Sequence, residues 1–111
     1  MKTAASLAAL LILFSPASWA QDTDYDKRNT HIFCSSHLAL VIDSLDEEGR
    51  GYQALASLSR MHRDAGRTLG ATKEHFDQVA GYLEKVRNDD QQKWNSLSAQ
   101  SKRVCLPKSD D

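Results

Sequence analysis

The stretch Cys34–Leu45, CSSHLALVIDSL, decides the fold of this 111-residue chain. It is the most apolar stretch outside the N-terminal leader, and it begins with one of only two cysteines. Its apolar residues recur every three or four positions, which is the period of one face of an α-helix. The repeat comprises Cys34, Leu38, Val41 and Leu45. This stretch therefore predicts a helix whose apolar face packs against the rest of the protein.

Residues 1–20 have the organisation of a secretory signal peptide. Lys2 supplies a positive start, and the apolar run Leu7–Phe14 is too short to span a bilayer. Small residues at Ser18 and Ala20 fit the −3 and −1 positions of a cleavage site. We expect cleavage after Ala20, export to the periplasm or the cell exterior, and no integral membrane segment afterwards. An uncleaved membrane anchor is the alternative, which the shortness of the run disfavours.

The rest of the chain is long enough for one small domain. Its expected parts are a frayed or helical lead over 21–30, a helical bundle over 31–106 and a disordered tail over 107–111. The chain has 14 Lys and Arg against 15 Asp and Glu. Such a balance gives no electrostatic basis for binding nucleic acid or an acidic membrane surface.

The two cysteines of an exported chain are most simply one disulfide. Joining Cys34 to Cys105 closes most of the domain into one loop. In the chain-entropy description, a loop of that length stabilises the fold by about 4 kcal/mol. The alternatives are two free thiols or two metal ligands, but the CxxC spacing of typical thiolate sites is absent.

Three further segments show apolar residues at helical spacing: Leu55–Leu69, Phe76–Val86 and Trp94–Val104. Gly70 directly follows the first of them, as a residue that ends a helix should. Thr72 is well placed to cap the next helix, because its hydroxyl can accept a hydrogen bond from the first turn. Together with the first stretch, these segments predict an all-α protein.

The polar stretch Arg87–Lys93 leaves two topologies open. One is three helices with a long third helix, and the other has a turn at Asn88–Asp90 and a fourth helix. An uninterrupted helix of about 32 residues would carry Cys105 about 48 Å along its axis, away from Cys34. Disulfide-bonded residues need Cα atoms within about 7 Å. We therefore predict a small up-down-up-down four-helix bundle, with the long third helix as the alternative.

Histidines are the only side chains whose positions suggest a metal site. His62 lies on the apolar face of the second helix, and antiparallel pairing is expected to place it level with His37 on the first. Two imidazoles at one level of a bundle can bind a metal ion or titrate together. His31, Cys34 and His37 are also spaced by three, but steps of three drift around a helix. A buried histidine with a hydrogen-bond partner is the simpler interpretation.

Three arginines form a basic stripe on the second helix: Arg60, Arg63 and Arg67. The stretch Asp43–Glu48 ends the first helix in acidic residues. A charged stripe is most often a solvated helix face. Its functional interpretation is a docking surface for an acidic protein partner.

The sequence contains no motif that specifies catalysis or a cofactor. It has no CxxCH, no CxxC and no glycine-rich phosphate loop. We expect a protein that is not an enzyme and has no cofactor. The preferred hypothesis is a protein-binding module of the cell envelope, of inhibitor, chaperone-like or toxin-neutralising type, whose partner is another envelope protein. The alternative is a small-ligand or metal-binding bundle that uses His62 and His37.

Overall fold

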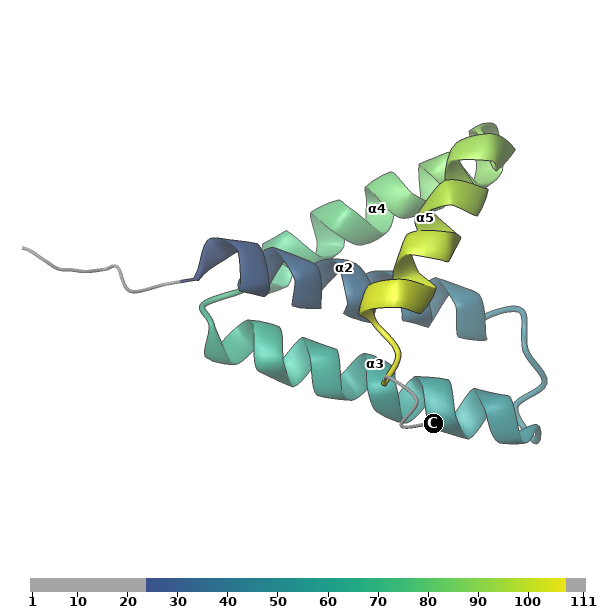
Figure 1. Ribbon diagram of the computed structural model, residues 1–111, viewed down its shortest axis with the longest axis horizontal. Helices are drawn as coiled ribbons and strands as arrows, with labels where there is room; N and C mark the ends of the chain where they lie inside the picture. Colours follow the sequence, from purple (N-terminus) through teal and green to yellow (C-terminus); the bar gives the residue numbers. More distant parts are fainter. Residues whose placement is uncertain (1–23, 108–111) are drawn as a thin grey trace, which may run out of the picture.

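A computed structural model describes residues 24–107 and confirms an all-α protein of four compactly packed helices (Figure 1). The helices are α2 (Tyr25–Ile42), α3 (Arg50–Thr68), α4 (Lys73–Asp89) and α5 (Gln91–Val104). The expected signal peptide and residues 108–111 of the expected tail lie outside the described residues. None of these four helices is long and apolar enough to cross a membrane.

Helix α2 is the centre of the fold. It packs against each of the other three helices, and most extensively against α3. Figure 1 shows α3 and α4 running along different sides of α2, while α5 descends steeply across it. Within residues 24–107, the backbone of α3 lies close to that of α2 alone, although the ring of Phe76 on α4 reaches Gly66. One long side of α3 is therefore left without a helical partner.

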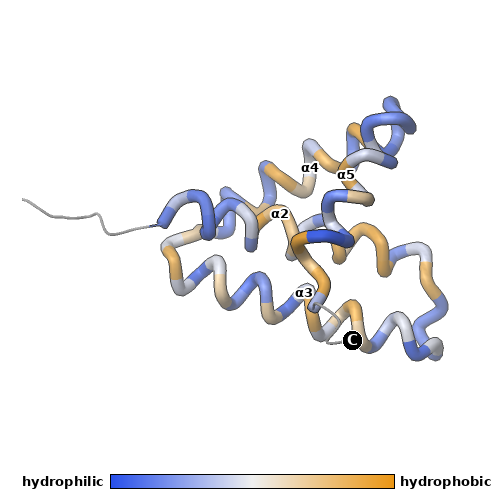
Figure 2. Tube along the Cα trace, in the orientation of Figure 1, coloured by the Kyte–Doolittle hydropathy of each residue, from blue (hydrophilic) through white to orange (hydrophobic). Residues whose placement is uncertain are grey.

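The turn between α4 and α5 confirms the four-helix topology. Helix α4 ends at Asp89 and α5 begins at Gln91, with Asp90 between them. The Asp90 carboxylate accepts a hydrogen bond of 3.0 Å from the backbone N–H of Lys93. Asp90, the last residue of the expected turn Asn88–Asp90, is therefore the residue that caps α5. Figure 2 shows hydrophilic residues gathered at this turn and at the α2–α3 connection.

The α3–α4 connection is built from local hydrogen bonds that the sequence predicts. Gly70 has φ of +100°, a left-handed conformation that suits glycine. The backbone N–H of Gly70 donates to the carbonyl oxygen of Arg67, and the N–H of Ala71 donates to the carbonyl oxygen of Gly66, both at 2.9 Å. These two hydrogen bonds form a Schellman motif, which ends α3. Thr72 then caps α4 as expected, and the side chain of His75 completes a capping box.

The disulfide Cys34–Cys105 is present and lies in the core. Both cysteines are buried, with Cα atoms 5.3 Å apart. Leu38 completes the buried cluster. The partly buried residues packed against it come from α2, α3 and the end of the chain: Phe33, Leu55, Leu58 and Leu106. The disulfide therefore fixes the end of α5 against α2.

Candidate functional site

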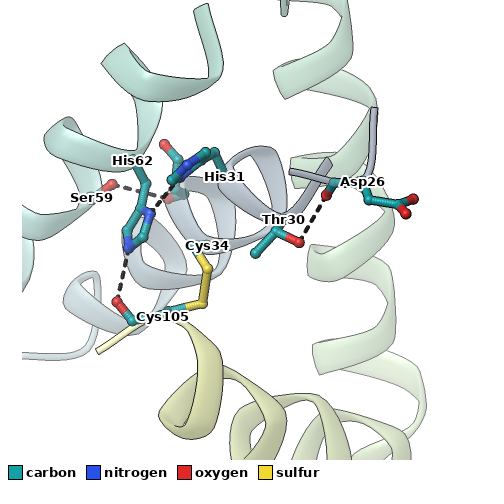
Figure 3. The surroundings of a disulfide bond; sticks show 8 residues. Asp26, Thr30, His31, Cys34, Ser59, His62 and Cys105 are labelled. Carbon is teal, nitrogen blue, oxygen red and sulfur yellow. Dashed lines mark hydrogen bonds between the residues drawn. A yellow bond between two sulfur atoms is a disulfide. The ribbon is translucent and has the colours of Figure 1, made fainter. Parts of the chain in front are cut away.

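Two histidines face each other across the α2–α3 interface, beside the disulfide (Figure 3). The Nδ1 atoms of His31 and His62 are 3.0 Å apart. The Nε2 atom of His62 is 2.8 Å from the backbone carbonyl oxygen of Cys105. This chain of contacts joins α2, α3 and the C-terminal end of α5 at one point.

The carbonyl of Cys105 determines where the protons of the pair reside. A carbonyl oxygen only accepts, so Nε2 of His62 carries the hydrogen. In neutral His62, Nδ1 is then an acceptor whose lone pair is directed at His31. His31 must donate from its own Nδ1, which leaves its Nε2 as a free acceptor. Burial, followed by the positive charges of His62 and Lys27, lowers the pKa of His31.

Close packing at Gly66 brings α2 and α3 together next to the histidines. A Cβ atom at Gly66 would lie 3.5 Å from Cβ of His31 and 3.3 Å from the ring of Phe76. The Oγ atom of Ser59 also donates a 2.9 Å hydrogen bond to the carbonyl of Ser35. Both contacts hold the two helices in one register, in which His62 is level with His31.

This register differs from the expected one, which placed His62 level with His37. Helix α2 ends at Ile42, before the end of the expected helical stretch at Leu45, and α3 begins at Arg50, before the expected apolar repeat that starts at Leu55. Both differences place the middle of the α2–α3 connection earlier in the sequence than expected. In an antiparallel pair, an earlier turn pairs each residue of the second helix with an earlier residue of the first. His62 therefore lies opposite His31 rather than His37.

His37 has an environment of its own. Only 2 % of the residue is exposed, its Nε2 is 3.2 Å from Ser98 Oγ, and its ring stacks on Trp94 at 4.7 Å between centroids. Its buried Nδ1 has no hydrogen-bond partner among the described residues. Burial lowers the pKa of His37. Because no described contact joins His37 to His62, a metal site that uses both remains a prediction.

A small cavity beside His37 lies between α2, α3 and α5. Its volume is about 250 Å³. Its lining is mostly apolar, with two serine hydroxyls and one lysine: Leu38, Val41, Leu55, Leu106, Ser98, Ser101 and Lys102. An apolar pocket with few polar groups is the usual form of a small-molecule site.

A second cavity, of about 330 Å³, is open at the surface above the histidine pair. His31 and His62 line it together with Met61, which is 62 % exposed. The remaining lining is mainly apolar: Leu58, Ala65, Val104, Cys105, Leu106 and Pro107. No group of three His, Cys, Asp or Glu side chains in residues 24–107 is placed to hold a metal ion.

The basic stripe lies on the outer part of α3. Arg60, Arg63 and Arg67 are exposed, and none of them forms an ion pair with another described residue. Arg63 also lines a groove of about 240 Å³ between α2, α3 and α4, together with Asp43 and Asp77. The three guanidinium groups of the stripe are thus exposed to solvent, and one of them, that of Arg63, also borders the groove.

The sequence did not predict that His31 pairs with His62. The spacing of His31 from Cys34 can be read from the sequence, but the contact with His62 depends on the register of two helices. No family model matches the sequence, and no match is found among curated proteins or solved structures. Function is therefore inferred from the residues and geometry of this chain.

Proposed function

We propose that this protein is a non-enzymatic protein-binding module of the cell envelope, of inhibitor, chaperone-like or toxin-neutralising type. One observation carries the proposal: the outer part of α3, whose backbone lies close to α2 alone within the described chain, bears three arginines without ion pairs. Arginine is enriched at protein interfaces, because its guanidinium group forms paired hydrogen bonds with carboxylates.

The distribution of charge supports an acidic partner. The stripe of Arg60, Arg63 and Arg67 lies on α3, whereas the stretch Asp43–Glu48 that precedes α3 is acidic. Opposite charges at separate places on one surface steer and orient a partner as it approaches. The disulfide holds α2 and the end of α5 together, and a preorganised surface loses less entropy on binding. A disulfide also persists in the oxidising compartment to which the leader would direct the chain.

Affinity purification from the cell envelope tests this proposal. The tagged protein should retain a specific partner that 0.5 M salt releases, and Arg60→Glu, Arg63→Glu and Arg67→Glu together should reduce recovery at least tenfold. A matched control makes the same change in net charge elsewhere, with Lys73→Glu, Lys85→Glu and Arg103→Glu. Equal loss in both triple variants would contradict the role of the stripe.

Binding of a small apolar ligand is the second candidate function. It is favoured by the cavity beside His37, where a buried imidazole lacks one hydrogen-bond partner and Lys102 contributes a positive charge. A short apolar acid such as octanoate is the chemical probe that fits this lining. Ser98→Leu should fill the cavity and abolish octanoate binding in calorimetry, whereas Ser96→Leu on the exposed side of α5 should not. Absence of binding to the unaltered protein would remove this candidate.

A further inference from the structure

The histidine pair has the arrangement of two metal ligands supported by a backbone group. A ligating histidine commonly donates its other ring N–H to a carbonyl, which fixes its tautomer and orientation. His62 makes this contact with Cys105 at 2.8 Å. Its Nδ1 lone pair is then directed at Nδ1 of His31, 3.0 Å away. The two Nδ1 atoms that share a hydrogen in this contact can instead both bind one metal cation.

Met61 supplies a third donor at the same cavity. It precedes His62 on α3, lines the cavity above the pair, and leaves 62 % of its surface in solvent. A methionine side chain is flexible, and Met61 lines the same cavity as the two rings, which makes its thioether a candidate third ligand. Two imidazoles and one thioether form a neutral set of donors.

We propose that His31, His62 and Met61 form a binding site for a copper(I) ion. Thioether ligands select soft ions such as Cu(I) rather than Mg²⁺ or Ca²⁺. The mainly apolar lining offers no carboxylate to balance a second positive charge. The positive charge of Lys27, which already lowers the pKa of His31, also opposes a divalent ion more strongly than a monovalent one.

The two imidazole rings need only a small rearrangement to bind one ion. Two nitrogens bound at about 2.0 Å to a three-coordinate ion lie about 3.5 Å apart. The rings must therefore separate by about 0.5 Å from their present distance, and the proton on Nδ1 of His31 must leave or move to Nε2. His31 is partly exposed, so its ring has room to move.

Anaerobic titration of the oxidised mature protein with Cu(I), in competition with the chromophoric chelator bicinchoninate, tests the site. We expect one equivalent to bind. His31→Gln should weaken binding at least a hundredfold, and Met61→Leu about tenfold. Zn(II) should bind the unaltered protein at least tenfold more weakly than Cu(I). Histidine Cε1–H resonances in NMR spectra should shift for His31 and His62 on addition of Cu(I).

His75→Gln is the matched control, because it removes one histidine and glutamine is a normal capping-box residue at that position. It should bind Cu(I) as the unaltered protein does. Helical circular dichroism establishes that each variant is folded. No stoichiometric binding, or equal weakening by His75→Gln, would overturn the proposal. Binding that Met61→Leu leaves unchanged, with Zn(II) as tight as Cu(I), would also overturn the copper(I) assignment.

Discussion

The hydroxyl of Ser59 on α3 donates a 2.9 Å hydrogen bond to the backbone carbonyl of Ser35 on α2, and both residues are buried. This contact crosses the most extensive helix interface in the protein. It lies about one turn from the level where His31 meets His62. A polar contact in this position favours one register over its neighbours, because a slipped register would leave the hydroxyl buried without a partner.

Ser59→Ala should lower the free energy of unfolding by about 1 kcal/mol, the usual net value of a buried hydrogen bond. Urea denaturation followed by circular dichroism measures the change. Ser57→Ala is the control, since Ser57 is exposed on the same helix and should change stability by less than about 0.5 kcal/mol. Equal effects of the two substitutions would show that the hydrogen bond does not contribute.

Removal of the disulfide by Cys34→Ala with Cys105→Ala should cost about 4 kcal/mol, because the unfolded chain loses its long cross-link. The disulfide closes a sequence separation of 71 residues. The denaturation midpoint of the double variant, compared with that of the oxidised protein, gives this value. Reduction of the unaltered protein should produce a similar loss, and a stability unchanged by either treatment would contradict the prediction.

The sequence predicted the four helices and the disulfide because each depends on local spacing or on a single geometric limit. Apolar periodicity located the helices, and the short Cα distance of a disulfide favoured a fourth helix over a long third helix. The register of α2 and α3 was not predictable in the same way. It depends on where α2 ends, at Ile42, and on the close approach at Gly66. Helix ends are uncertain by a few residues in sequence, and a shift of that size changes which histidine His62 meets.

A pair of proline substitutions tests the break between α4 and α5. Gln91→Pro should be tolerated within about 1 kcal/mol, because Gln91 is the first residue of α5 and needs no helical N–H bond. Asp90 before it has φ of −143° and ψ of 85°, which lies outside the α region that a following proline disfavours. Asp89→Pro should cost about 3 kcal/mol, since Asp89 is the last residue of α4.

Thermal denaturation of both proline variants provides the comparison. Asp89 lies within the turn that the sequence predicts at Asn88–Asp90, whereas in the structure the first position of the following helix is Gln91. Tolerance of Asp89→Pro together with disruption by Gln91→Pro would place the break one or two residues earlier than described. Equal disruption by both would indicate a continuous helix.

The buried imidazole of His37 should make the protein less stable in mild acid. Burial lowers the pKa of His37 in the folded protein below its ordinary value of 6.5. As pH falls through 6.5, the unfolded chain takes up a proton that the folded protein does not, and the free energy of unfolding decreases. The contribution is complete above pH 6.5 and is lost between that value and the lower folded pKa. The loss is at most about 1.4 kcal/mol per pH unit for one histidine.

Urea denaturation at pH 7.5, 6.5, 5.5 and 5.0 measures this loss, and His37→Phe isolates the part due to His37. Phenylalanine keeps an aromatic ring against Trp94, where the imidazole stacks at 4.7 Å, but it cannot be protonated. The variant should lose less stability than the unaltered protein over this range. His31, whose pKa is also lowered, is present in both proteins and therefore cancels in the comparison. Parallel losses in the two proteins would show that His37 does not cause the acid sensitivity.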